Sequence, residues 1–276
     1  MRRSTTSAGT DRQAAHARKR KTLCAFLIAE LICALLLLGR FDTPSAPVMA
    51  APASMTTPSA ASASQTLRDG RTVRLLGLGG QRTSALLARI AAEIDDAAAA
   101  VTAFWGPDWP SEIVVVAAAT PDQFAAIGGG DVHTAATTAE QIMFAPDADA
   151  MSDSALRIVL RHELFHYAAR AQTAADAPRW LTEGVADFVA RPATPRPHVA
   201  VATLPTDAEL AGPQRDAAYD RAWLFSRFVA ETYGVAALRD LYQRACGHGH
   251  ADTSTALRET LDAEPHAILQ RWRQWM

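Results

Sequence analysis

The order of hydrophobic patterns along the chain constrains the fold more than any other feature of the sequence. Before Pro146, apolar residues occur mainly in short runs rich in β-branched side chains, which indicate strands, with one stretch of helical spacing among them. After Pro146 the apolar spacing is helical to the end of the chain. Strands that come first and helices that follow as a block favour an α+β fold, here a small mixed sheet followed by a helical C-terminal lobe.

Turn residues and capping residues set the expected limits of these elements. Strands are expected over 72–78, 112–118 and 141–144, with a turn at 128–130 where three glycines follow one another. The amphipathic segment 84–104 predicts a helix that ends at Gly106 and Pro107. Later helices are expected over 216–232, 236–245, 253–261 and 265–276.

The first fifty residues are typical of an export signal. A positive segment at 18–21 precedes the apolar run 23–38, and Val48-Met49-Ala50 offers the small residues that a signal peptidase reads. We therefore expect 1–50 to be either a cleaved signal peptide or an uncleaved membrane anchor. In both cases the rest of the protein lies outside the cytoplasm, and contact with the membrane is limited to this N-terminal segment.

The composition changes after the apolar run. Residues 41–65 are rich in Pro, Ala, Ser and Thr without hydrophobic periodicity, so 51–65 are predicted to be a disordered linker before a single domain over 66–276.

The chain beyond residue 50 holds 19 basic and 26 acidic residues. Nucleic-acid binding requires a basic face, so this charge argues against a nucleic-acid partner. The oligomeric state stays open.

One helix carries a pair of histidines with metal-ligand spacing. The segment Arg161-His162-Glu163-Leu164-Phe165-His166 lies in a helix that Ser152 can cap. Residues at i and i+4 stand on one face of a helix, so His162 and His166 can reach the same metal ion. Glu163 lies beside that face, where a carboxylate can accept a proton from a water on the metal.

A second helix supplies a possible third ligand. A catalytic zinc site needs three protein ligands and one open position. Sixteen residues separate His166 from Glu183, which is enough for a turn and the start of a helix that begins near Pro178 and ends near Arg191. Asp187 follows Glu183 by four residues, on the same helix face, where it could accept the second ring N–H of a ligand histidine.

These two segments resemble the gluzincin metallopeptidases, whose active-site helices are thermolysin-like. His-Glu-Leu-Phe-His followed by Trp-Leu-Thr-Glu-Gly-Val-Ala-Asp is most similar to the small bacterial peptidase domains of that group, over roughly residues 140–245. The resemblance implies a Zn²⁺ ion on His162, His166 and Glu183, with Glu163 as the general base and Asp187 behind a histidine ligand. It also implies a zincin-type active-site helix and a substrate-binding edge strand made of Gln141, Ile142, Met143 and Phe144.

Two residues are candidates for the hydrogen-bond donor that stabilises the negative charge developing on the carbonyl oxygen of the substrate. Tyr219 is the first tyrosine after Glu183, and a tyrosine on the following helix can fill this role in related domains; the alternative is a core aromatic beside Trp223 and Phe228. His198 is the weaker candidate.

The segment Cys246-Gly247-His248-Gly249-His250 could bind a second metal ion, but its glycines and the flanking helices favour a connecting loop.

The leading hypothesis is an exported zinc metallopeptidase that acts on a peptide or protein substrate. The Gly-x-Met-Glu-Asn motif of gluzincin aminopeptidases is absent from the sequence, which favours an endopeptidase. One alternative is a catalytically silent binding protein with a structural zinc, and another is a metal-dependent hydrolase of a non-peptide bond. The presence of Glu163 favours an enzyme, because a structural site has no use for a base.

Overall fold

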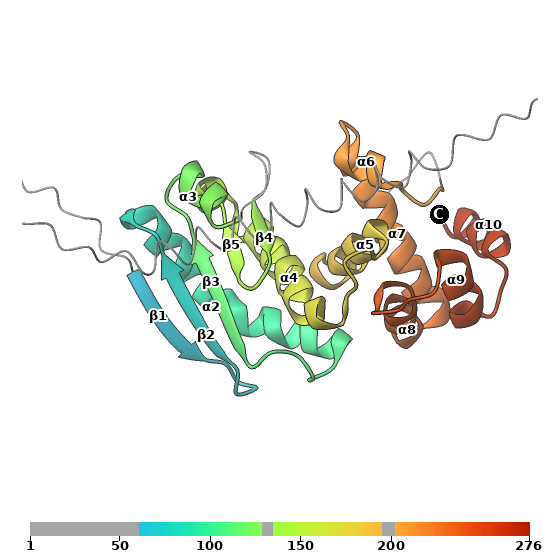
Figure 1. The fold of residues 1–276 in the computed structure, drawn as a ribbon, viewed down its shortest axis with the longest axis horizontal. Helices are drawn as coiled ribbons and strands as arrows, with labels where there is room; N and C mark the ends of the chain where they lie inside the picture. Colours follow the sequence, from blue (N-terminus) through green and yellow to red (C-terminus); the bar gives the residue numbers. More distant parts are fainter. Residues whose placement is uncertain (1–60, 129–134, 195–201) are drawn as a thin grey trace, which may run out of the picture. The chain divides into compact units, whose positions relative to one another are not determined.

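The computed structural model describes residues 61–128, 135–194 and 202–276, in which a five-stranded mixed sheet precedes a block of helices (Figure 1). The α+β fold predicted from the sequence is therefore confirmed. The described residues belong to one compact unit. None of their helices is both long enough and apolar enough to span a membrane. The expected export segment 1–50 and His198 lie outside the described residues.

The sheet combines parallel and antiparallel pairing. In spatial order its strands are β1 (Ala61–Thr66), β2 (Thr72–Gly77), β3 (Glu112–Ala117), β5 (Ile142–Phe144) and β4 (Ala136–Thr138). Strands β2, β3 and β5 run parallel, while β1 and β4 pair antiparallel with their neighbours at the two ends of the order. Strand β5 is buried along its whole length, whereas β2 alternates buried residues with more exposed ones such as Arg74, so the outer face of the sheet is only partly covered.

Strand β1 corrects the predicted disordered linker over 61–65, which belong to an ordered strand, while the rest of that linker lies outside the described residues. The strand pairs with β2 in a continuous register from Ala61↔Gly77 to Thr66↔Thr72. Its residues are largely exposed, so an edge strand here requires backbone hydrogen bonds but no hydrophobic alternation. Gly70, with φ +88°, allows the tight turn between the two strands.

Strand β5 corrects the prediction of a substrate-binding edge. It lies inside the sheet, paired with β3 through Val115↔Ile142 and with β4 through Thr137↔Met143. Ile142, Met143 and Phe144 are fully buried, because three consecutive apolar side chains need cover on both faces of the sheet. Among the described residues, the terminal strand on this side is β4, a short Ala-Thr-Thr segment that hydrophobic patterns do not reveal.

Two long helices cover one face of the sheet. Helix α2 (Gly80–Trp105) and helix α4 (Asp153–Ala169) pack against each other and contribute to one core with the inward residues of the sheet. The short helix α3 (Pro121–Ala126) covers part of the opposite face, where Phe124 packs with Val116 and Met143. Ser152 caps α4 as predicted, accepting a hydrogen bond from the Ala155 N–H.

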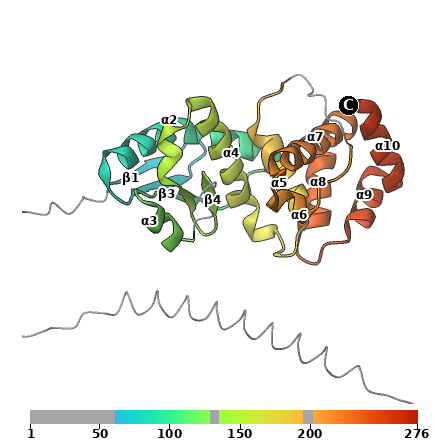
Figure 2. The ribbon, with the colours of Figure 1, turned by 90° about the horizontal axis from the view of Figure 1, so that it is seen from above.

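The C-terminal lobe is helical. It contains α5 (Arg179–Ala190), α6 (Asp207–Ala211), α7 (Arg215–Tyr233), α8 (Val235–Cys246), α9 (Thr253–Leu261) and α10 (Pro265–Trp275). Figures 1 and 2 both show α5 lying between α4 and α7, with which it packs. Gly184 permits the close approach of α5 to α7, since a Cβ atom there would lie 2.5 Å from the carbonyl oxygen of Ala222. This packing places the start of α5 against the histidine face of α4.

Candidate metal centre

Helices α4 and α5 bring three potential ligands together. His162 and His166 lie one turn apart on α4, and Glu183 lies in the second turn of α5. The Nε2 atoms of the two histidines are 3.1 Å apart, and Glu183 Oε2 lies 3.2 Å from His162 Nε2 and 3.6 Å from His166 Nε2. The three side chains are 15 to 22% exposed, so the site is accessible from solvent.

The spacing of these atoms fits a metal ion. Ligand atoms bound tetrahedrally at about 2.1 Å from one ion stand about 3.4 Å from one another. The observed separations of 3.1 to 3.6 Å bracket that value, and His162, His166 and Glu183 therefore form a group that could hold a metal ion. Two imidazole nitrogens and one carboxylate oxygen leave further coordination positions open on the solvent side.

Asp187 lies behind His162, on the side away from the other ligands. Its Oδ1 atom is 2.9 Å from His162 Nδ1, and its Oδ2 atom is 2.6 Å from a guanidinium nitrogen of Arg191. With the ring N–H at Nδ1 donated to Asp187, the lone pair of Nε2 points toward Glu183 and His166. This is the contact expected of Asp187 from its position one turn after Glu183.

The electrostatics of the group couple its histidines to the carboxylates around them. Burial lowers the pKa of His162, but the hydrogen bonds with Asp187 and Glu183 outweigh it and raise this pKa well above the usual value. Burial raises the pKa of Glu183, but the two histidines outweigh it and hold this pKa well below the usual value. Both shifts express the short-range attraction between the imidazoles in their charged form and the neighbouring carboxylates.

Glu163 stands next to the ligand group without belonging to it. Its carboxylate Oε2 accepts a hydrogen bond of 2.8 Å from Thr138 Oγ1, a residue of strand β4. Glu163 is 9% exposed and lines the same cavities as His162. Sequence reasoning missed Thr138, because its contact with Glu163 depends on where β4 docks on α4 and leaves no pattern in the sequence.

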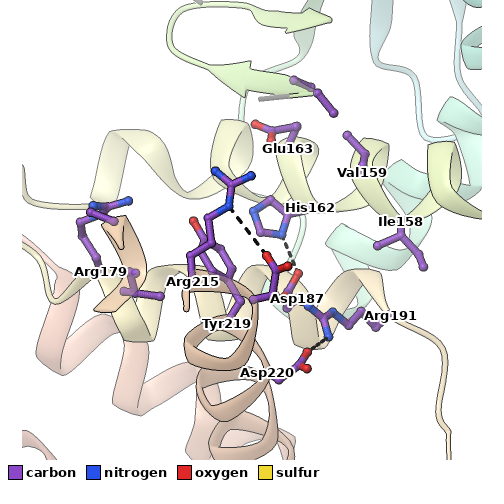
Figure 3. Close-up of a pocket in the computed structure, with 15 residues that line it drawn as sticks. Ile158, Val159, His162, Glu163, Arg179, Asp187, Arg191, Arg215, Tyr219 and Asp220 are labelled. Atoms are coloured by element: carbon purple, nitrogen blue, oxygen red, sulfur yellow. Dashed lines mark hydrogen bonds and ion pairs between the residues drawn. The ribbon is translucent and has the colours of Figure 1, made fainter. Parts of the chain in front are cut away.

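Two cavities that share part of their lining form a cleft beside the ligand group. One cavity of about 570 Å³ extends toward α6 and α7, and the other, of about 470 Å³, extends toward α8. Both are lined by Ala136 of β4, His162, Glu163, Arg179 and Tyr219. Figure 3 shows the first cavity, with His162 and Glu163 on one wall and Tyr219 and several arginines around it.

Tyr219 contacts both the core and the cleft. Half-buried on α7, it packs against the edge of the core and also faces both cavities. Burial and the neighbouring Glu183 carboxylate raise the pKa of its hydroxyl to about 12. The phenol is therefore protonated at neutral pH and can donate a hydrogen bond into the cleft.

Arginines of the cleft were not singled out from the sequence. Arg191 bridges Asp187 and Asp220 with ion-pair distances of 2.6 and 2.7 Å (Figure 3). The i, i+4 spacing of Asp187 and Arg191 is a signal that could have predicted this pair. Arg179, the first residue of α5, lines both cavities; its position in the cleft follows only from the packing of α5 against α4.

The segment 246–250 forms a connection between helices. Cys246 is buried, and burial raises the pKa of its thiol to about 12, which disfavours the thiolate that metal binding requires. His248 contacts the carbonyl oxygen of Ala171, and His250 contacts Asp176. Within the described parts of the chain, the group found with metal-ligand proximity is the one on α4 and α5.

Comparison with known proteins adds no assignment. The chain matches no protein-family model, and no curated protein matches it. The site is therefore defined by its own geometry: three convergent ligand atoms, a carboxylate beside them and a cleft that exposes both.

Proposed function

We propose that this protein is an exported zinc-dependent metallopeptidase, most simply an endopeptidase. The observation that carries the proposal is the triangle formed by His162, His166 and Glu183, with the Glu163 carboxylate beside it on the wall of an open cleft. Two imidazoles and a carboxylate with open positions are a ligand set typical of catalytic zinc. The gluzincin resemblance of the same residues supports this choice.

A bound zinc ion would act as a Lewis acid and lower the pKa of a coordinated water toward ~7. Two residues of the protein then act on the proton and on the developing negative charge. Glu163, held by Thr138, accepts the proton of the water that attacks the peptide carbonyl carbon, and delivers it to the amine as the C–N bond breaks. Tyr219 donates a hydrogen bond to the carbonyl oxygen as negative charge develops there.

Strand β4 is suited to hold an extended substrate. It ends the strand order of the described sheet, and all three of its residues line the cavity beside the ligands. A peptide added to this edge by backbone hydrogen bonds would cross the ligand group with little demand on its side chains. The cleft continues in both directions from Glu163, which suits a substrate with residues on either side of the scissile bond.

Two other functions use the same residues. A silent binding protein would keep the metal as a structural element, and a hydrolase could attack an ester in place of an amide. The placement of Glu163 favours catalysis, because this carboxylate lines the cleft beside the ligand atoms and is held by Thr138.

The decisive experiment compares metal content and proteolysis in the full chain. Wild type, Glu163→Gln and the control Glu259→Gln, a substitution on an exposed face of α9, are assayed for bound zinc and for cleavage of a generic unfolded protein. We expect one zinc per chain in all three proteins. Activity should persist in the control and fall by about 10²- to 10⁴-fold in Glu163→Gln, the range for a general base. Equal activity of wild type and Glu163→Gln would rule out the mechanism, and absence of zinc would rule out the site.

A further inference from the structure

The cleft contains a guanidinium that the proposed chemistry does not use. Arg179 is exposed and lines both cavities, and its guanidinium makes no hydrogen bond or ion pair within the described residues, although its backbone carbonyl accepts one from Thr182. Other arginines of the cleft differ in this respect: Arg191 is held between two aspartates, and Arg170 lies 3.7 Å from Glu140. The positive charge of Arg179 is therefore available to a molecule in the cleft.

A second arginine, Arg215, lines the first cavity together with Arg179. Arg215 is the first residue of α7 as Arg179 is the first residue of α5, and each precedes a cleft residue, Tyr219 or Glu183, by one helical turn. Figure 3 shows Arg179 and Arg215 among the residues that line the first cavity. The ion partner of Arg215 is its chain neighbour Asp216 at 3.7 Å, whose side chain is 99% exposed. Such a pair binds weakly and leaves the guanidinium free to contact a ligand.

The position of Arg179 does not favour an arginine on grounds of fold stability. A cation in the first turn of a helix is repelled by the positive end of the helix dipole. The first turn of α5 holds no acidic residue that would offset this repulsion. The two arginines and the two helix ends instead sum to a positive potential over one wall of the cleft. Of the carboxylates that line the first cavity, Asp187 and Asp220 are bound by Arg191 and Asp216 lies 3.7 Å from Arg215; within the described residues none forms an ion pair with the side chain of Arg179.

We propose that Arg179, assisted by Arg215, binds a carboxylate of the substrate close to the bond that is cleaved. The planar guanidinium offers paired N–H donors that match the two oxygens of a carboxylate. Because Arg179 shares both cavities with Glu163, the bound carboxylate lies within the cleft beside the reacting bond. The carboxylate belongs either to an Asp or Glu side chain or to the C-terminus of the peptide. This inference rests on the proposed peptidase function.

The test uses short synthetic peptides that differ only in Glu or Gln beside a common hydrophobic centre, each with a free or an amidated C-terminus. For wild type we expect kcat/KM to be about tenfold or more higher for peptides with a carboxylate, as for a charge-assisted hydrogen bond. The Glu-to-Gln ratio should approach one in Arg179→Gln and be partly restored in Arg179→Lys. Arg74→Gln, an exposed arginine of β2 paired with Glu112, should keep the wild-type ratio. A preference that follows only the free C-terminus assigns the carboxylate to the chain end.

A binding measurement separates failure of this inference from failure of the proposed function. Affinities of the same peptides for Glu163→Gln, and for Glu163→Gln combined with Arg179→Gln, are measured by fluorescence anisotropy in the presence of zinc. We expect the carboxylate peptides to bind several-fold more tightly to the first protein only. If wild type cleaves no peptide, the peptidase proposal fails, while this affinity ratio still decides the role of Arg179. The proposed role of Arg179 would be overturned by equal affinity for the Glu and Gln peptides and for both C-termini. It would also be overturned by a carboxylate preference that survives the loss of Arg179.

Discussion

Replacing Gly184 with alanine tests whether the metal ligands depend on the close packing of two helices. A Cβ atom at this position would lie 2.5 Å from the Ala222 carbonyl oxygen, 2.7 Å from the carbonyl carbon and 2.9 Å from Ser226 Oγ. Two of these atoms belong to the backbone of α7 and cannot rotate away. Ordinary contact begins near 3.4 Å, so α5 must move by about 0.9 Å relative to α7.

This displacement is large on the scale of a metal site. Ligand distances in such sites hold within about 0.2 Å, and Glu183 is the residue directly before Gly184. We expect overpacking to cost about 1–3 kcal/mol in unfolding free energy, offset by about 0.8–1 kcal/mol from the higher helix propensity of alanine. Zinc affinity should fall roughly tenfold or more, since the carboxylate is drawn away from the two imidazoles.

Urea unfolding and competition with a zinc chelator measure the two effects in the full chain. The reverse substitution at an exposed site, Ala99→Gly in the middle of α2, provides the control. It should cost about 1 kcal/mol through helix propensity alone and leave zinc affinity unchanged. If Gly184→Ala were at least as stable as wild type and bound zinc equally well, the packing argument for the position of Glu183 would be wrong.

Three further substitutions give distinct outcomes. Asp187→Asn should lower zinc affinity by about 10- to 100-fold in a chelator competition, because His162 loses the carboxylate that fixes its tautomer. Tyr219→Phe should lower kcat by about 10²-fold without changing zinc content, as for removal of one oxyanion donor; an unchanged kcat would assign Tyr219 to packing alone. The hydrogen bonds from Arg221 and Thr206 lower the pKa of Glu209 from 4.5 to about 2. This carboxylate therefore stabilises the fold above about pH 4.5 and loses that effect as the pH falls toward 2. Glu209→Gln should destabilise the protein at pH 7 and have a smaller effect at pH 3, measured by urea unfolding at both values; an equal effect would contradict the assigned pKa.

The helical part of the fold was largely predictable because its signals are local. The prediction of a helix over 253–261 agrees with α9, and Ser152 caps α4 as its position suggested. Helix periodicity repeats within a few residues, and caps act within one turn, so neither depends on distant contacts. The short helices α3 and α6 were missed because five or six residues carry too little periodicity.

The strands were less predictable because their pairing depends on contacts between segments far apart in the chain. An edge strand such as β1 or β4 forms through backbone hydrogen bonds to a neighbour and needs little apolar content. The wholly apolar β5 was recognised as a strand, but its place between β3 and β4 depends on long-range pairing. The prediction that Gln141–Phe144 form an edge failed at this step.

The sequence by itself determined which residues could ligate a metal, because the i, i+4 spacing of His162 and His166 places both imidazoles on one helix face whatever surrounds the helix. Only the tertiary structure decided that Glu183 reaches them, through the packing of α5 between α4 and α7. It also decided that Thr138 holds Glu163 and that Arg179 opens into the cleft. Spacing within a helix is fixed by covalent geometry, whereas contacts between elements depend on how side chains far apart in the chain pack together.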